Sequence, residues 1–291
     1  MTEAAAPDAE TTTGRVLAFD SGIGGLSIVG ALRAQAPNVR IDYVADNAVF
    51  PYGELADDVL IARVEAVLEA AIARSRPDVV VIACNTASTV ALAAMRERFA
   101  VPFVGCVPPI KWAASLSQTR TIGLLATRAT VRRPYLRDLQ ERFAADCTLL
   151  AHGARGLADI AERVFRGHEP DETAIRHELE GLFGQPGGDR IDVVGIGCTH
   201  YSVLLPTLQG LSPRAMTWLD PAGAVARQTA NLLKGGDVLT DADLAVPERA
   251  WVTALPSEPH LLTRKIAAYG YPDTTLMPIK LHSVQEHLWI T

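Results

Sequence analysis

Cysteine, lysine and long hydrophobic runs are all scarce in this chain of 291 residues. The four cysteines form no CxxC pair, which argues against a zinc knuckle or a thioredoxin-type redox motif. Only four of the 27 basic residues are lysines, so chemistry that needs a lysine has few candidates. No apolar stretch approaches the roughly 18 residues that a membrane-spanning helix requires. We therefore expect each cysteine to be a core residue or a reactive thiol, in a protein that does not cross a membrane.

The chain also lacks an excess of positive charge and a basic N-terminus. Its net charge of −6 argues against nucleic acid as a partner. Residues 1–14 carry Glu3, Asp8 and Glu10 where a secretory signal would be basic, and no apolar segment follows. We expect residues 1–14 to be a flexible tail and the protein to be cytoplasmic. The 48% of hydrophobic residues and the length suit one large or two modest globular domains.

Predicted strands and helices alternate along most of the chain. Short apolar runs indicate strands at 15–19, 41–45, 78–83, 121–126 and 191–197. Helical spacing of apolar residues indicates helices over 55–76, 86–99 and 132–144 and around 157–165 and 175–183. The run DVVVIA at 78–83 has no polar alternation, which is typical of a parallel strand buried on both faces. The pattern predicts an α/β fold with mainly parallel sheets.

An internal repeat relates two parts of the sequence. Asp78 opens the segment DVVVIACNT, and Asp192 opens the segment DVVGIGCTH. In both segments a cysteine stands at the end of the predicted strand and is followed by small polar residues that suit a helix N-cap. Each copy is also preceded by a strand that ends in a polar turn. We infer two similar α/β units, each with a cysteine at the carboxyl edge of its sheet, where ligands bind in open α/β folds.

The two repeated cysteines are Cys84 and Cys198. Each is either a small buried hydrophobic residue or a reactive thiol. The matched positions favour the second interpretation, because the positive end of a following helix lowers the pKa of a thiol. Cys106 and Cys147 lack that setting, and we expect them to be structural.

A glycine-rich turn, DSGIGG at 20–25, follows the first predicted strand. It resembles part of a dinucleotide-binding fingerprint, and Asp42 lies about 20 residues further on. However, Ser27 stands where that motif requires glycine. The turn still allows the backbone to approach a ligand closely. Asp20 is either a helix N-cap or a carboxylate near a thiol or an ammonium group, and we favour the second.

Thr199 and His200 directly follow the second repeated cysteine. A histidine beside a thiol can move its proton or stabilise the thiolate. The alternative interpretation is a helix-capping pair. The segment Pro51-Tyr52-Gly53 is by composition only a turn.

Two thiols that face each other across a cleft suit the inversion of a carbon stereocentre. One thiolate removes the proton from carbon, and the opposite thiol returns a proton to the other face. The developing negative charge needs helix N-termini and hydrogen-bond donors around it. Ser21, Asn85, Thr86 and Thr199 are placed to supply them.

The segments FDSGIGG, ADNAVFPYG, ACNTAS and GCTHY occur in this order. With them the chain resembles the glutamate racemase family, part of the cofactor-independent aspartate/glutamate racemase superfamily, from about Arg15 to about Ala268. The resemblance implies two pseudo-symmetric parallel-sheet α/β domains with the active site in the cleft between them. By the family's pattern, the first domain covers 15–107 plus 220–285 and the second covers 108–219.

The resemblance also implies roles for individual residues. Cys84 matches the base that removes the proton from D-glutamate, and Cys198 matches the base that acts on L-glutamate. Asp20 and His200 match the residues that assist them. The implied substrate-binding positions are Asp20, Ser21, Pro51, Tyr52, Gly53, Asn85, Thr86, Thr130, Thr199 and His200. The implied reaction interconverts L- and D-glutamate without pyridoxal phosphate or metal and supplies D-glutamate for peptidoglycan.

The resemblance further implies a homodimer. Some relatives also inhibit DNA gyrase, and this acidic sequence neither indicates nor excludes that role. Three features depart from the family pattern. Ser202 follows GCTHY where proline is usual, the segment at 220–223 reads DPAG where DSG is frequent, and Asp159 aligns with a family glutamate in HGARGLADIAE. A tail like residues 1–14 takes part in control by a cell-wall precursor in some relatives.

Three other activities remain as alternatives. The first is a racemase for aspartate or another amino acid of the same superfamily. The second is a nicotinamide-binding oxidoreductase, against which Ser27 argues. The third is a Cys–His hydrolase, for which the second matched thiol is superfluous.

Overall fold

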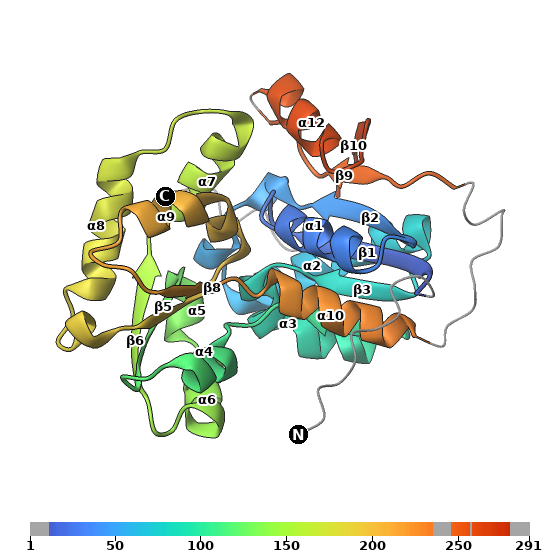
Figure 1. Cartoon of the computed structure of the whole chain (residues 1–291). Helices are drawn as coiled ribbons and strands as arrows, with labels where there is room; N and C mark the ends of the chain where they lie inside the picture. The colour runs from blue at the N-terminus through green and yellow to red at the C-terminus, as the bar shows by residue number, and fades with distance from the viewer. Residues whose placement is uncertain (1–11, 235–245, 257, 280–291) are drawn as a thin grey trace.

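The computed structural model describes residues 12–234, 246–256 and 258–279, which form two all-parallel sheets (Figure 1). The first sheet consists of β1 (Gly14–Asp20), β2 (Val39–Ala45), β3 (Val79–Ile82), β4 (Phe103–Gly105), β9 (Ala250–Val252) and β10 (Thr274–Leu276). The second consists of β5 (Thr121–Thr127), β6 (Thr148–Ala154), β7 (Val193–Gly197) and β8 (Thr217–Leu219). The predicted fold class, two parallel-sheet α/β domains, is confirmed.

The two sheets share one strand order, which explains the internal repeat. The first runs β10-β9-β2-β1-β3-β4 and the second runs β6-β5-β7-β8. In each sheet the earliest strand is therefore flanked by the next two along the chain. The chain passes from the first sheet to the second between β4 and β5 and returns after β8. In such an order, the carboxyl edge beside the earliest strand is the usual place for a ligand.

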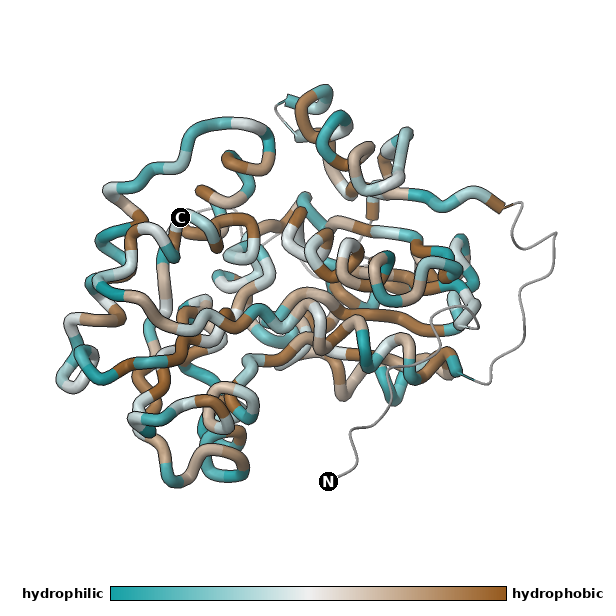
Figure 2. Tube along the Cα trace, viewed as in Figure 1, coloured by the Kyte–Doolittle hydropathy of each residue, from teal (hydrophilic) through white to brown (hydrophobic). Residues whose placement is uncertain are grey.

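Helices cover both faces of each sheet. In β1, Val16 and Ala18 face the core under α1 (Leu26–Gln35) and α10 (Ala222–Leu233), whereas Leu17 and Phe19 face α2 (Asp57–Ser75) and α3 (Asn85–Arg98). The tube in Figure 2 is accordingly hydrophobic along these strands. The second sheet is covered by α4 (Ile110–Leu116) and α6 (Pro134–Phe143) on one face, and by α7 (Leu157–Arg166), α8 (Glu172–Phe183), η4 (Thr199–Leu204) and α9 (Leu205–Gly210) on the other. The remaining short elements are α5 (Arg128–Arg132), α12 (Pro259–Ala267), η1 (Asn47–Val49), η2 (Tyr52–Glu54) and η3 (Gly188–Arg190).

The repeated aspartates have the same structural role in both sheets. An Asp78 oxygen accepts a hydrogen bond from the backbone N–H of Arg15 at 2.7 Å, where the chain enters β1. Asp192 accepts from the backbone N–H groups of Gln118 and Thr119 at 2.7 and 3.0 Å, just before β5. Each aspartate thus anchors the start of the central strand of its sheet.

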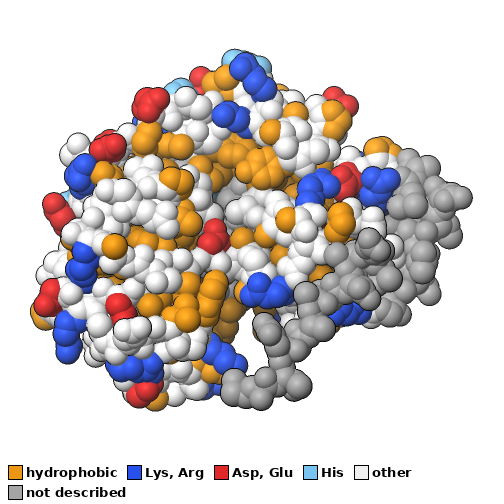
Figure 3. All heavy atoms as spheres, viewed as in Figure 1, with side chains coloured by type: hydrophobic (Ala, Val, Ile, Leu, Met, Phe, Trp, Pro, Cys, Tyr) orange, Lys and Arg blue, Asp and Glu red, His pale blue; other side chains and the backbone are white. Residues whose placement is uncertain are grey.

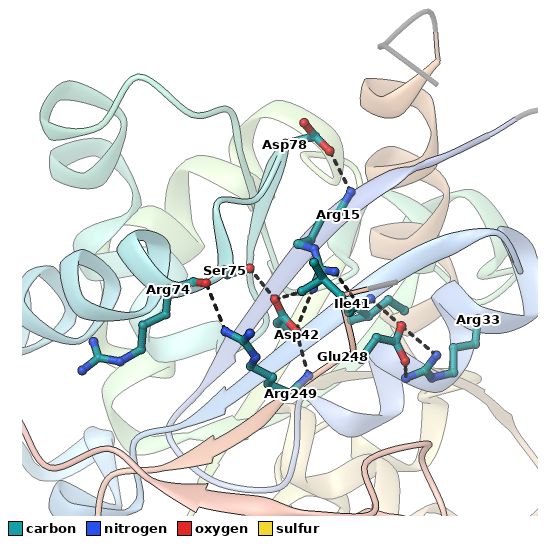
Figure 4. A network of polar contacts seen from close by, with 10 residues as sticks. Arg15, Arg33, Ile41, Asp42, Arg74, Ser75, Asp78, Glu248 and Arg249 are labelled. Carbon is teal, nitrogen blue, oxygen red and sulfur yellow. Dashed lines mark hydrogen bonds and ion pairs between the residues drawn. The ribbon is translucent and has the colours of Figure 1, made fainter. Parts of the chain in front are cut away.

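Asp42, which the dinucleotide alternative would have placed against a ribose, lies instead in a buried structural network (Figure 4). Its carboxylate accepts hydrogen bonds from the Arg15 guanidinium at 3.0 and 3.2 Å, from the Ser75 hydroxyl at 2.6 Å and from the backbone N–H of Arg249 at 2.8 Å. The neighbouring Glu248 pairs with Arg33 at 2.8 Å. The hydrogen bond from Arg249 holds the residues before β9 against β2. Because an unpaired buried charge is costly, the carboxylate of Asp42 is surrounded by donors.

Several elements differ from the prediction. β6 was not predicted, because it is an edge strand with little full burial and a weak apolar pattern. The short strands β8, β9 and β10 were also missed. Gly14 belongs to β1 and Thr12 is buried, so the assignment of 1–14 as a tail is wrong at its end; residues 1–11 and 280–285 lie outside the described residues. None of the helices in the described part of the chain is long and apolar enough to span a bilayer.

Candidate active site

The site lies where the carboxyl edges of the two sheets meet. Asp20 ends β1 and Cys84 lies two residues beyond β3, whereas Thr127 ends β5 and Cys198 directly follows β7. Both thiols are unoxidised, and each residue is only 6% exposed. The matched strand order therefore brings one cysteine from each sheet into the same buried region, where the charge of one acts on the other.

Asp20 joins the two parts of the site. Its Oδ1 atom accepts hydrogen bonds from the backbone N–H of Gly22 at 2.9 Å and from the Ser21 hydroxyl at 3.3 Å. Its Oδ2 atom accepts from the Thr199 hydroxyl at 2.8 Å, across from the other sheet. Ser21 Oγ also lies 3.8 Å from the sulfur of Cys84. Ser21 thus links Asp20 to the first thiol, Thr199 links Asp20 to the second sheet, and the carboxylate is fully buried.

The expected lowering of the thiol pKa is wrong for Cys84. Burial raises the pKa of this thiol, and the negative charge of Asp20 raises it further. The backbone N–H of Ala87 at the start of α3 and the Ser21 hydroxyl act in the opposite direction, but they do not offset desolvation of a thiolate. The protein environment by itself therefore favours the thiol form of Cys84 over the thiolate.

His200 is held by Glu162, a glutamate that the sequence analysis did not single out. His200 Nε2 lies 3.2 Å from Glu162 Oε1, which also accepts the backbone N–H of Ile23 at 2.9 Å. Asp159, aligned with the family glutamate, is exposed. Both residues lie on α7, but only Glu162 is on the face that turns toward His200. Glu162 is the last residue of the segment HGARGLADIAE, and this glutamate was the signal that the sequence offered.

The Glu162–His200 pair is charged. Burial lowers the pKa of His200, but hydrogen bonds with Cys198 and Glu162 and the charge of Asp20 raise it well above the ordinary value. Burial raises the pKa of Glu162, yet its contacts with His200, the Ile23 N–H and Arg166 outweigh this and lower it. The buried pair therefore places an imidazolium beside the second thiol.

A chain of hydroxyls connects the two sheets on the other side of the site. Thr86 Oγ1 lies 3.2 Å from Thr127 Oγ1, which lies 2.9 Å from Thr130 Oγ1. The turn at Gly53 packs here as well, because a Cβ atom on it would lie 3.7 Å from the Thr127 side chain. The predicted positions Gly53, Thr86 and Thr130 are thus brought together. Thr127 was missed because a threonine at a strand end carries no distinctive pattern.

Tyr52 is oriented by a carboxylate that the sequence analysis did not single out. Its hydroxyl donates to Asp46 at 2.6 Å, and Asp46 also pairs with Arg63 at 2.6 Å. The Tyr52 side chain is thereby turned into the core, and the backbone beside it faces the hydroxyl chain. Pro51, also predicted, precedes this turn through a cis peptide bond with Phe50. The position of Asp46 at the end of β2, parallel to Asp20 in β1, was the available signal.

Asn85 offers an unused donor next to the first thiol. Its Oδ1 atom accepts from the thiol of Cys106 at 3.4 Å. Its Nδ2 atom is buried and has no hydrogen-bond partner within the described ranges. A buried amide without a partner is costly, so a ligand that accepts this hydrogen bond would be stabilised.

Two cavities flank the site without containing its thiols. One, of about 340 Å³, lies between α7 and α12 and is lined by Glu162, Arg163 and Arg166 among others. The other, of about 500 Å³, lies between α4, α6 and α10, where Figure 3 shows hydrophobic side chains gathered. Within the described ranges, no three His, Cys, Asp or Glu side chains are grouped to hold a metal ion.

Comparison with known proteins gives concordant matches. The model of the Asp/Glu/Hydantoin racemase family matches residues 26–229. The glutamate racemase of Sphingopyxis alaskensis is 43% identical over 91% of this chain and 96% of its own. That of Granulibacter bethesdensis is 57% identical over 76% of this chain and 79% of its own.

The chain belongs to the glutamate racemase family.

Solved structures of this family have the same fold. The Escherichia coli glutamate racemase, solved with L-glutamate and the activator UDP-MurNAc-ala, superposes with a TM-score of 0.84 at 36% identity, covering 91% of this chain and 98% of its own. Family membership makes the chain an isomerase of the amino-acid racemase type.

Proposed function

We propose that this glutamate racemase family member interconverts L- and D-glutamate through Cys84 and Cys198, without a cofactor. The pairing of two cysteines at equivalent strand ends of two sheets with one strand order carries the proposal. Relatives named glutamate racemase, one of them solved with L-glutamate, support the substrate.

The reaction needs only a proton exchange between carbon and sulfur. The thiolate on one face takes the α-proton, and the electron pair of the C–H bond moves into the α-carboxylate as an enediolate. The thiol on the other face then gives its proton to the α-carbon. One thiolate becomes a thiol and the other thiol becomes a thiolate, so the net charge is unchanged. By the family assignment, Cys198 takes the proton from L-glutamate and Cys84 takes it from D-glutamate.

Substrate binding would correct the unfavourable pKa of Cys84. Burial is the main cause of the raised pKa, and the charge of Asp20 adds to it. A substrate ammonium group beside Asp20 would neutralise that charge and favour the thiolate. On the other face, the imidazolium of His200 stabilises the thiolate of Cys198. Asp20 and His200 would therefore act on opposite faces of the α-carbon of glutamate.

The donors of the site suit the two carboxylates of glutamate. The free amide of Asn85 would bind the α-carboxylate, where the negative charge develops, and the Thr199 hydroxyl keeps its hydrogen bond to Asp20 beside it. The hydroxyls of Thr86 and Thr130 and the backbone beside Tyr52 would bind the side-chain carboxylate. This second set selects for the length of the substrate.

We also propose a place and role for the reaction. D-glutamate would be supplied for peptidoglycan, and the four unoxidised cysteines suit the reducing cytoplasm. Two units, 15–107 plus 220–285 and 108–219, would close on the substrate. The enzyme would also be a homodimer, as the resemblance to the glutamate racemase family implies.

Proton NMR of the enzyme with L-glutamate in heavy water, followed in parallel by circular dichroism, tests the proposal. We expect the α-proton signal to disappear and the optical signal to decay to zero with no added cofactor. Activity with aspartate but not glutamate would refute the substrate assignment. Silence with both would refute the racemase activity.

The substitutions Cys84→Ser and Cys198→Ser test the two-thiol mechanism. We expect each to slow racemisation by a factor of about 10² to 10⁴, since serine is a far weaker acid and base at neutral pH. Cys147→Ser, at a buried thiol of the second sheet far along the chain from the site, is the matched control and should keep the wild-type rate. A near-wild-type rate in Cys84→Ser or Cys198→Ser would overturn the mechanism.

A further inference from the structure

The carboxylate of Glu162 faces two directions. Its Oε1 atom points into the site and contacts His200 Nε2 and the backbone N–H of Ile23. Its Oε2 atom points away from the site and accepts a hydrogen bond from Arg166 Nη1 at 3.0 Å. Arg166 is one helical turn further along α7 and contacts none of the thiols. It is thus a cation behind the carboxylate, on the side opposite the imidazole.

The surroundings make this contact more than a surface ion pair. The side chains of Arg166 and Glu162 are 17% and 12% exposed, and both line the cavity between α7 and α12. Partly desolvated pairs are screened much less than exposed ones. Arg163, on the same helix and lining the same cavity, is exposed. The helix therefore presents one arginine that is engaged with the site and one that is directed to solvent.

We propose that Arg166 is a positioning residue of the racemase reaction, which fixes Glu162 so that its other oxygen holds the Nε2–H of His200. The inference rests on the proposed function. With Oε2 bound, the carboxylate has one orientation left for Oε1, and the imidazole keeps its opposite edge toward Cys198 and Asp20. Without Arg166, the carboxylate is free to rotate toward the cavity and take water as its partner.

The pH dependence has a defined sign. Burial raises the pKa of Glu162, whereas His200, the Ile23 N–H and, to a smaller extent, the charge of Arg166 lower it, so removal of the Arg166 charge raises that pKa. The protonated carboxyl no longer stabilises the imidazolium, and activity is lost at a higher pH on the acid side. We therefore expect the acid limb of the pH profile to move upward, since the loss of a nearby opposite charge favours the protonated carboxyl. The other ionisable groups that act on Glu162 or His200 are Asp20 from β1, Tyr43 from β2 and Cys198 after β7.

The test compares Arg166→Gln, Arg166→Lys and Arg163→Gln with the wild type on L- and D-glutamate. We expect Arg166→Gln to lower kcat about tenfold, to change KM by less than about twofold and to move the acid limb of the kcat/KM profile upward. Arg166→Lys keeps the charge and should restore most of the acid limb. Arg163→Gln should match the wild type.

Isotope effects add a readout that a structural role would not move. Because Cys198 acts on L-glutamate, Arg166→Gln should raise the primary isotope effect for α-deuterated L-glutamate and lower it for α-deuterated D-glutamate. Since enantiomers have equal energy, kcat/KM must fall equally in both directions. If the wild type is active and Arg166→Gln has an unchanged pH profile, the role of Arg166 alone is overturned. The same holds if Arg166→Gln loses thermal stability without the shifts in the acid limb and in the isotope effects. An inactive wild type would overturn the proposed function instead.

Discussion

Gly22 shows how closely single residues are fitted in the site. A Cβ atom on Gly22 would lie 2.2 Å from Glu162 Oε1 and 2.6 Å from His200 Nε2. Both atoms are buried and hydrogen-bonded to each other, so neither can move away without breaking the pair. The glycine in the turn is therefore needed for space at this position.

We expect Gly22→Ala to lower kcat/KM at least about tenfold, because displacement of His200 misplaces a group that stabilises the second thiolate. Gly30→Ala is the matched control, since a Cβ there meets only a Tyr269 carbon at 3.8 Å. It lies inside α1, where alanine should add about 0.5–1 kcal/mol of stability. Steady-state kinetics and thermal unfolding of both variants provide the comparison. Wild-type activity in Gly22→Ala would contradict the packing argument.

At the scale of elements, the start of each central strand depends on an aspartate of a neighbouring segment. Asp192 accepts hydrogen bonds from two backbone N–H groups and from the Ser117 hydroxyl before β5. Burial raises the pKa of Asp192, but these hydrogen bonds outweigh it and lower the pKa below its usual value. A carboxyl with a lowered folded-state pKa stabilises the fold above its unfolded-state pKa and ceases to do so as the pH falls through the folded-state pKa.

We expect Asp192→Ala to reduce the free energy of unfolding by about 1–2 kcal/mol at neutral pH, since the lost acceptor is ionised but partly exposed. The difference from the wild type should shrink below about pH 4, where the unfolded aspartate is protonated. Chemical denaturation at pH 7 and pH 3 measures both values. Asp189→Ala, at an exposed position on η3, should change neither. A difference that grew on acidification would refute the assignment.

At the scale of the whole molecule, ion pairs connect the two sheets across the site. Arg133, just before α6, pairs with Asp57 in the first turn of α2. The hydrogen bond from Arg133 lowers the pKa of Asp57. The pair joins α2, which covers the first sheet, to the start of α6, which covers the second.

We expect Asp57→Asn and Arg133→Gln each to raise KM for glutamate about two- to fivefold, the range that an exposed pair supports. The double variant should match the single ones, because both remove one interaction. High salt should bring the wild type toward the variants. Arg98→Gln removes the exposed pair with Glu65 within the first unit and should leave KM unchanged. A larger KM for the double variant than for either single one would contradict a shared contact.

The sequence was sufficient for features with local or periodic signals. The buried run at 78–83 predicted a central strand, and the repeated segments predicted two related sheets with matching thiols. It was insufficient for Asp46 and Thr127, which act through contacts with distant residues. It was also insufficient for Glu162, because the sequence does not show which face of α7 turns toward His200.

What the sequence by itself determined is the alternation of strands and helices and the position of each cysteine at a strand end, since both follow from hydrophobic period and neighbouring residues. Only the tertiary structure decided which groups meet and how they ionise. Asp20 and Thr199 are brought together by the closure of two sheets, and Arg166 reaches Glu162 behind His200. The pKa of Cys84 is raised because burial outweighs the helix N-terminus, and burial depends on every element packed around a residue.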